Sequence, residues 1–254
     1  MTDLHVAIIS SERPNAVERM EKLLDGLDPT WYVPQGQMAD YLYGGAAQVQ
    51  EVLQGDTAEG GEDRPTISDQ RNVALDDAKD LDAWCVMFND DLAVNDRFPT
   101  GINIVDDDLD EHPTEAAVAL RLIIQNMELR GARLGGCAAT TNKFFLPKDT
   151  YGTRHFIMGQ LMVVAPGEEL RFKRVFGSKE DYDYTCQHLA TYGKVCRANR
   201  VLGNFRHNEK RGGWANYRSL EEQRLLSLAL VERWHPHVVH NPRRDGEVLI
   251  KWKA

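Results

Sequence analysis

The order of apolar runs and helical patterns in the first ninety residues constrains the fold most. Residues 4–11, 30–34 and 83–88 are apolar runs of strand length, and the helical patterns of residues 15–24 and 71–81 lie between them. Alternating strands and helices place consecutive strands side by side in one parallel sheet, with the helices on its faces. The sequence therefore predicts an α/β fold of Rossmann-like type, with a mixed, mainly parallel central sheet flanked by helices.

The rest of the chain continues this alternation without an internal repeat or a recognisable linker. A chain of 254 residues suits one large α/β domain, and we predict a single domain over residues 1–254. Beyond residue 100 we predict strands at 102–105, 155–166, 194–202 and 246–252, helices at 112–130, 180–193 and 219–233, and a glycine-containing loop at 133–145.

Composition limits the environment in which the protein works. No apolar run approaches the roughly 20 residues that span a bilayer, and the N-terminal stretch MTDLHVAIISS lacks the basic start of a signal peptide. The four cysteines form no CxxC pair and predict reduced, buried thiols. We therefore expect a cytoplasmic protein without a membrane partner.

Charge divides unevenly along the chain. Residues 1–120 carry 7 Lys/Arg and 26 Asp/Glu, a balance of −19, whereas residues 121–254 carry 23 and 13, a balance of +10. The stretch at 194–218 holds seven Lys/Arg, one Glu and three aromatic residues, of which Trp214 and Tyr217 are candidates for base stacking. This pattern is typical of a solvated surface or of contact with nucleic-acid phosphates or diphosphates.

Two strand ends carry polar residues where ligands of open α/β sheets bind. The apolar run WCVMF is followed directly by Asn89, Asp90 and Asp91, and the first strand is followed by the turn SERP with Ser11 and Arg13. The carboxyl ends of adjacent parallel strands meet at one edge of the sheet. Adjacent carboxylates there indicate either a surface turn or a site for a divalent cation with oxygen ligands, Mn²⁺ or Mg²⁺.

The order of these motifs resembles that of the nucleotide-sugar glycosyltransferases of the GT-A fold. The matching stretches are SSERP, QRNVALDDA, CVMFNDDL, GQLMVV, EDYDYTCQHLATYG, KVCRANRVL and FRH. Asn89–Asp91 stand where that superfamily has its Asp-x-Asp element, with Asn in place of the first acid. The resemblance implies a GT-A domain with a donor-nucleotide half at 1–110 and an acceptor-facing half at 111–254.

A nearer resemblance is to the glycosyltransferases associated with TET/JBP oxygenases in phages, which are related to base J glucosyltransferase. SERPNAVERM, WYVP, QRNVALDDA and FNDDL carry it, and it extends over roughly residues 4–210. It implies transfer of a sugar from a UDP-sugar to 5-hydroxymethylcytosine, or to another hydroxymethylpyrimidine, in DNA.

The resemblance also assigns roles to individual residues. Asp181 would be the general base, with Glu180 and Asp183 as rivals. The donor nucleotide would be held by Ser11, Arg13, Arg71, Asn89 and Asp90, and the divalent metal by Asp91 and His207. Each residue also has an ordinary structural interpretation: a surface arginine, a surface histidine, or an acid favoured by the positive end of a helix dipole.

Three other functions remain open from the sequence. A nucleotidyltransferase also uses strand-end acids and a metal, but SSERPN lacks the glycine-rich, basic triphosphate loop typical of that class. A glycosyltransferase could act on a protein or small-molecule acceptor. A non-catalytic nucleic-acid-binding module could use residues 194–218.

Overall fold

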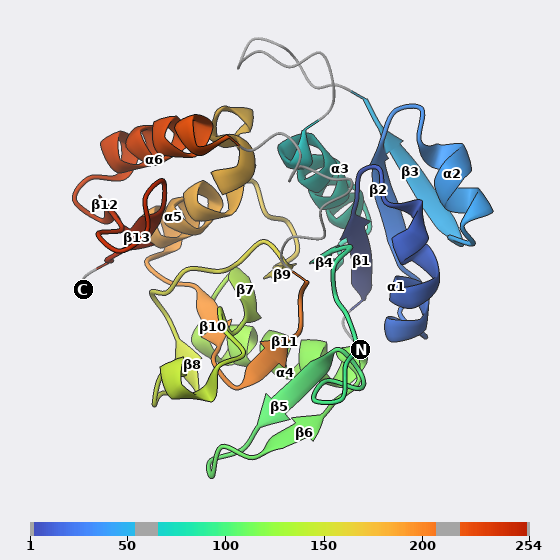
Figure 1. Ribbon diagram of the computed structural model, residues 1–254, viewed down its shortest axis with the longest axis horizontal. Helices are drawn as coiled ribbons and strands as arrows, with labels where there is room; N and C mark the ends of the chain where they lie inside the picture. The colour runs from blue at the N-terminus through green and yellow to red at the C-terminus, as the bar shows by residue number, and fades with distance from the viewer. Residues whose placement is uncertain (1–2, 54–65, 207–218, 253–254) are drawn as a thin grey trace.

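One mixed sheet forms the centre of the protein. The computed structural model describes residues 3–53, 66–206 and 219–252. In this part of the chain, eight strands pair in the order β3-β2-β1-β4-β9-β7-β10-β8 (Figure 1). Their bounds are β1 Leu4–Ile9, β2 Thr30–Pro34, β3 Gln48–Val52, β4 Trp84–Asn89, β7 Leu134–Cys137, β8 Tyr151–Gly152, β9 Leu161–Val164 and β10 Cys196–Ala198.

Parallel pairing dominates the half of the sheet that comes first in the chain. Strands β3, β2, β1 and β4 are parallel to one another, and so are β7 and β10. Strand β9 is antiparallel to both β4 and β7, and β8 is antiparallel to β10. The predicted α/β class and the mixed, mainly parallel sheet are therefore confirmed.

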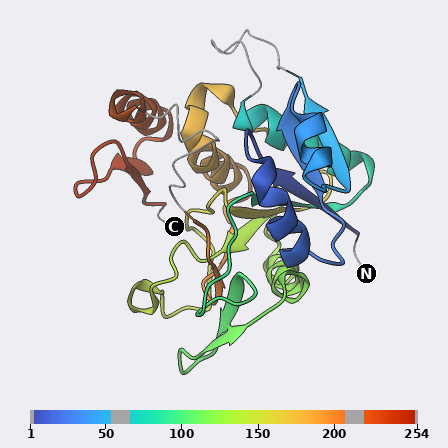
Figure 2. The same cartoon turned by 45° about the vertical axis from the view of Figure 1, so that its right-hand side comes forward.

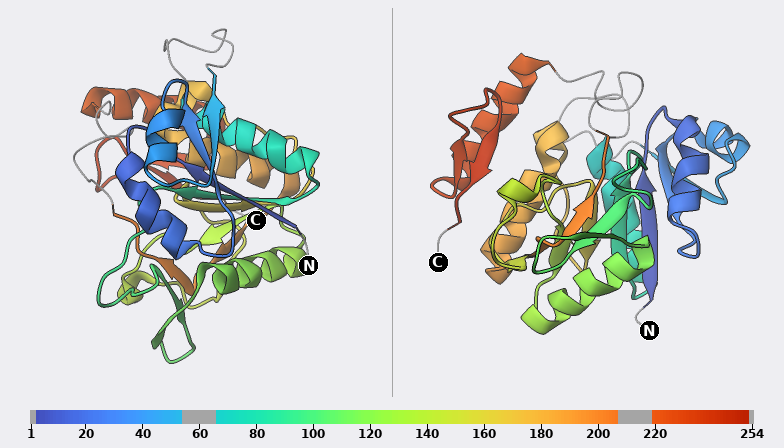
Figure 3. Two further views of the ribbon diagram at one scale, coloured as in Figure 1. Left: turned by 90° about the vertical axis from the view of Figure 1, so that its right-hand side faces the viewer. Right: turned by 60° about the horizontal axis from the view of Figure 1, so that its bottom comes forward.

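Helices cover both faces of this sheet because the side chains of its central strands alternate between two cores. On β4, Trp84, Val86 and Phe88 pack into the core that α1 and α4 close, whereas Cys85 and Met87 pack into the core that α3 and α5 close. Figure 3 shows the sheet with α4 on one side and α3 and α5 on the other. Each large apolar side chain buried this way stabilises the fold by about 1.5–3 kcal/mol.

The helices have the following bounds: α1 Val17–Leu23, α2 Met38–Tyr43, α3 Ile67–Asp80, α4 Ala116–Arg130, α5 Glu180–Tyr192 and α6 Leu220–Trp234. Two small sheets complete the fold, one of β11 Val201–Gly203, β5 Ile102–Val105 and β6 Glu111–Pro113, and one of β12 Val238–His240 and β13 Val248–Ile250. Helix α6 and the β12–β13 hairpin lie beyond α5, away from α1 and α2 (Figure 2). No helix in the described ranges has both the length and the apolar character needed to cross a bilayer.

Several element boundaries differ from the sequence predictions. Residues 133–145 contain the central strand β7 rather than only a loop, and residues 48–52 form the edge strand β3. The predicted strand at 194–202 is divided between two sheets, as β10 and β11. The predicted helix at 112–130 begins only at Ala116, because residues 111–113 pair with β5. All four cysteines are buried thiols, as expected.

The register of β1 and β4 fixes the place of the site. The two strands pair from Leu4 opposite Trp84 to Ile9 opposite Asn89, so that both end at the same level. The turn after β1 and the acids after β4 therefore meet at one edge of the sheet, as the sequence predicts for parallel strands.

Candidate active site

A cavity of about 620 Å³ opens at the carboxyl ends of β1 and β4. It brings together residues that lie as far apart in the sequence as 11 and 181. The predicted site residues that line it are Ser11, Arg13, Arg71, Asn89, Asp90, Asp91 and Asp181. His207, the predicted second metal ligand, lies outside the described residues, and so do the stacking candidates Trp214 and Tyr217.

Asp90 is the inner acid of the strand-end pair. Its side chain is 6% exposed, and its carboxylate accepts hydrogen bonds from the Ser10 hydroxyl and from Nη1 of Arg13 at 2.9 Å. Arg19 donates to the Asp90 backbone carbonyl at 2.7 Å, which fixes the turn. Burial raises the pKa of Asp90, and the charge of Arg13 opposes that rise. Asp90 thus ties the two strand ends together, whatever ligand it also meets.

Asp91 has a different environment on the cavity side of the same turn. Its Oδ1 atom is buried and has no hydrogen-bond partner among the described residues. Burial, followed by the negative charge of Asp90, raises the pKa of Asp91 to about 7. A buried oxygen without a partner is costly, and a bound divalent cation would remove that cost. The residue is therefore a suitable ligand for Mn²⁺ or Mg²⁺.

Arg71 is located differently from the sequence prediction. Helix α3 begins at Ile67, after a capping box between Thr66 and Asp69, so Arg71 lies in the second helical turn rather than at the start. Its side chain is fully buried. The guanidinium donates from Nη2 to Asn89 Oδ1 at 3.1 Å and to the Gly159 carbonyl at 2.8 Å. Arg71 is thus held by protein groups, and it orients Asn89 instead of standing in solvent.

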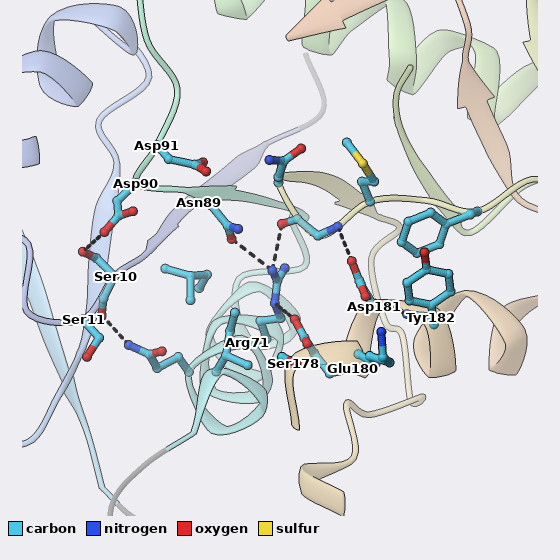
Figure 4. Close-up of a pocket in the computed structure, with 18 of the residues that line it drawn as sticks. Ser10, Ser11, Arg71, Asn89, Asp90, Asp91, Ser178, Glu180, Asp181 and Tyr182 are labelled. Atoms are coloured by element: carbon cyan, nitrogen blue, oxygen red, sulfur yellow. Dashed lines mark hydrogen bonds and ion pairs between the residues drawn. The ribbon is translucent and has the colours of Figure 1, made fainter. Parts of the chain in front are cut away.

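Glu180 completes the set of partners around Arg71. Its Oε1 atom lies 3.3 Å from Nε of Arg71, and the Glu180 side chain is 4% exposed. The ion pair joins the start of α5 to α3 across the bottom of the cavity. Figure 4 shows Asn89, Arg71 and Glu180 connected in this way beneath the strand-end acids.

Asp181 lies one residue further along α5, in its first turn. Its Oδ2 accepts a hydrogen bond from the Gly159 N–H at 3.0 Å, and its Oδ1 accepts one from the Tyr182 N–H at 2.9 Å. These two hydrogen bonds hold the carboxylate in place on the cavity wall.

Gly159 connects the two groups on this wall, since its N–H binds Asp181 while its carbonyl binds Arg71. A Cβ atom at this position would lie 2.6 Å from Nη2 of Arg71 and 3.3 Å from Oδ2 of Asp181. Glycine is therefore required for the close approach of backbone and guanidinium. The sequence alone indicated a strand over 155–166, whereas the structure has residues 156–160 as the loop that lines the cavity.

Asp183, one of the rivals to Asp181, has a structural role. Its carboxylate is fully buried, and it accepts hydrogen bonds from Trp234 Nε1 at 2.8 Å and Gln187 Nε2 at 2.7 Å. Arg233 lies 3.1 Å from it. These contacts attach α6 to α5, and Asp183 is not among the residues lining the cavity. Of the three acids, Asp181 alone combines a place in the cavity wall with a side chain that is not fully buried.

Residues from the C-terminal third of the chain close the other side of the cavity, and the sequence analysis assigned none of them to the site. Tyr182 stacks on Phe156 with ring centroids 3.9 Å apart and an interplanar angle of 10°. Others that line this side are Lys179, Arg206, Gln223, Arg244 and Glu247. They come from four separate segments, so local patterns could not group them.

The described residues do not by themselves form a complete metal site. Within the parts of the chain that the structure describes, no cluster of three His, Cys, Asp or Glu side chains could hold an ion. A cation at Asp91 would take its other ligands from a phosphate, from water or from residues outside those parts. No family model matches the chain, and no curated protein matches it significantly.

Proposed function

We propose that the protein is a metal-dependent, inverting glycosyltransferase of the GT-A type. It moves a sugar from a UDP-sugar to 5-hydroxymethylcytosine, or to another hydroxymethylpyrimidine, in DNA. The observation that carries the proposal is the pairing of Asp91 and Asp181 in one cavity. Figure 4 shows these two carboxylates on either side of the hydrogen bond between Asn89 and Arg71.

The donor would bind on the strand-end side of the cavity. Asp91, with His207 as a further ligand, would hold a divalent cation, which would supply positive charge to the leaving diphosphate. The nucleotide lies against Ser11 and the buried pair formed by Arg13 and Asp90. Asn89 is held by Arg71, which fixes the cavity floor beneath the sugar.

The acceptor would enter from the Asp181 side. Its hydroxyl gives a proton to Asp181 while its oxygen attacks the anomeric carbon. The bond from that carbon to the diphosphate oxygen breaks in the same displacement, so the anomeric configuration inverts. A base within a duplex cannot reach the cavity and must be extruded from the stack.

Radiolabelled UDP-sugars, offered with hydroxymethylated DNA or with the same DNA unmodified, test the proposal. We expect Mn²⁺-dependent incorporation of label into hydroxymethylated DNA only. Asp181→Asn is the matched control and should abolish the incorporation while the donor still binds. Absence of incorporation with every UDP-sugar would contradict the function. Equal DNA binding with and without donor and metal, in the absence of transfer, would favour a non-catalytic binding module.

A further inference from the structure

Two phenylalanine side chains stand in solvent just before β8. Phe144 is 86% exposed and Phe145 is 66% exposed. Their rings contact each other edge to face, with centroids 5.2 Å apart. A short 3₁₀ turn over Lys143–Phe145 presents them, and the Asn142 side chain caps that turn by accepting from the Phe144 N–H at 3.1 Å. Adjacent aromatic side chains that a formed turn holds in water are typical of a contact surface.

Four cations lie on or beside β8 and β10: Lys148 and Arg154 flank β8, Arg197 is in β10, and Arg200 follows β10. None of them has a carboxylate within 4.0 Å in the described part of the chain. Arg197 is opposite Gly152 of β8 in the register, and its Nε donates to Asn199 Oδ1 at 2.8 Å. Nη2 of Arg200 donates to the Lys148 carbonyl at 3.2 Å, while its buried Nε and Nη1 have no partner among the described residues.

The neighbouring cations of the β5–β6 hairpin are different. Arg97 lies 2.6 Å and Lys143 lies 3.7 Å from the carboxylate of Glu111, which offsets part of their positive charge within the protein. Among the cations around the aromatic pair, those without a carboxylate partner are therefore on the β8–β10 side.

Two chain segments connect this surface to the cavity. Residues 156–160, which line the cavity, follow Arg154 along the chain, and β11 leads from Arg200 to the cavity residue Arg206. Figure 1 shows β8, β10 and β11 close together. A partner bound to the β8–β10 side would therefore lie at the acceptor end of the site.

We infer that Phe144, Phe145, Lys148, Arg154, Arg197 and Arg200 form a docking surface for DNA, here called the aromatic–basic surface. DNA offers both phosphates for the cations and flat bases for the rings. The aromatic pair is placed to pack against bases beside the extruded one, and the cations hold the backbone. This assignment of an acceptor-binding surface rests on the proposed function for its role in catalysis, although the surface itself can be tested without it.

The test is a fluorescence-anisotropy titration with a labelled hydroxymethylated duplex, in the absence of donor and metal and over a range of salt concentrations. Removing two phosphate contacts with Lys148→Gln and Arg200→Gln should lower the slope of log K against log salt by about 1.8. Replacing Phe144 and Phe145 by Ser should weaken binding by roughly tenfold or more with the slope unchanged. The control is Arg121→Gln, an exposed arginine on α4, which should bind like the wild type.

If both double variants kept the wild-type DNA affinity and salt slope, the proposal that the aromatic–basic surface binds DNA would be wrong. It would also be wrong if the variants lost binding to vesicles of anionic lipid while keeping their affinity for DNA. Because the titration contains neither donor nor metal, its result is independent of catalysis. Wild-type DNA binding without any sugar transfer would refute the proposed function and leave the surface standing. Sugar transfer by the wild type, with DNA binding unaltered in both double variants, would support the proposed function and refute the docking surface.

Discussion

The cavity contains two acidic pairs that share one design, Asp90–Asp91 after β4 and Glu180–Asp181 at the start of α5. In each pair, the first acid is buried against an arginine and the second acid faces the cavity. Arg13 lies 2.9 Å from the first acid of one pair, and Arg71 lies 3.3 Å from the first acid of the other. The buried acid anchors the turn and thereby fixes the direction of its neighbour.

The two outward acids differ in what the protein gives them. Asp91 has a buried oxygen without a partner, beside another negative charge, and its pKa is raised to about 7. Asp181 accepts a backbone N–H on each oxygen. The first environment leaves an oxygen open to a ligand from outside, whereas the second already supplies a donor to each oxygen. Local hydrogen bonding thus gives the two outward acids different environments, and on this basis we propose metal binding for Asp91 and proton transfer for Asp181.

Asp91→Asn should have the largest effect, because an amide cannot supply the negative charge that a divalent cation requires. We expect transfer to fall by roughly 10³-fold, which corresponds to several kcal/mol of lost charge stabilisation. Initial rates, together with calorimetry of UDP binding with and without Mn²⁺, measure it. A transfer rate of the variant within about threefold of the wild-type rate would show that Asp91 is not the metal ligand.

Asp181→Asn should come next. It removes the proton acceptor and should lower kcat by about 10²-fold, the lower end of the contribution of a general base, with donor affinity unchanged in the same calorimetric assay.

Asp183→Asn is the matched control for this variant, since Asp183 is buried among α6 contacts. It should lower the free energy of unfolding by about 1–3 kcal/mol rather than selectively lowering kcat. If Glu180→Gln lost turnover with the donor bound and Asp181→Asn did not, the roles of the inner and outer acids would be reversed.

Gly159→Ala should have an intermediate effect that links the two sides of the comparison. The new Cβ would displace Arg71 and the carboxylate of Asp181, and such a shift near a reacting group can cost about 10²-fold in rate. A double-mutant cycle with Arg71→Lys measures the coupling, because lysine has no Nη2 atom for the Cβ to meet. Strictly additive losses would mean that the contact at 2.6 Å is not what makes glycine necessary.

His188→Phe should leave activity at neutral pH almost unchanged and alter only stability in acid. Burial lowers the pKa of His188 to about 4, against the opposing charge of Glu168. The unfolded chain therefore binds the proton first. The contribution of His188 to the free energy of unfolding is fully present above about pH 6.5. It is lost as the pH drops towards 4, by roughly 3 kcal/mol in all.

Urea unfolding midpoints of the wild type and of His188→Phe, at about pH 7.5 and about pH 4.5, measure the contribution of His188 to stability. They also show the pH range in which the variants of the two acidic pairs stay folded and can be compared. Phenylalanine fits between Tyr184 and Tyr192, which flank the imidazole. If the wild type and His188→Phe lost equal stability in acid, protonation of His188 would not be the cause of that loss.

The sequence predicts the site best where local pattern and topology agree. The apolar run of β4 and the strand order place Asn89–Asp91 at the sheet edge, beside the turn that holds Ser11 and Arg13. This follows because parallel strands bring their ends together. The same reasoning cannot predict which acid is buried, since that depends on contacts with Arg13 and Arg71 from other elements.

Close packing explains why the sequence prediction of a loop at residues 133–145 missed strand β7. The glycines of LGGC suggested a loop, yet β7 is a central strand. A Cβ on Gly135 would lie 2.4 Å from Met127 of α4, and one on Gly136 would lie 2.6 Å from the Leu161 carbonyl of β9. The glycines are there because a helix and a neighbouring strand approach the backbone. The need for glycine at these two positions can be recognised only when the positions of α4 and β9 are known.

The most direct test of the central claim is a crystal structure of the protein with UDP and Mn²⁺. We expect a carboxylate oxygen of Asp91 at roughly 2.1 Å from the ion, with diphosphate oxygens, water and other ligands completing a near-octahedral geometry. Asp181 should stay hydrogen-bonded to Gly159 and bind no metal. An ion and diphosphate located away from Asp91, or an ion bound by Asp181, would contradict the account.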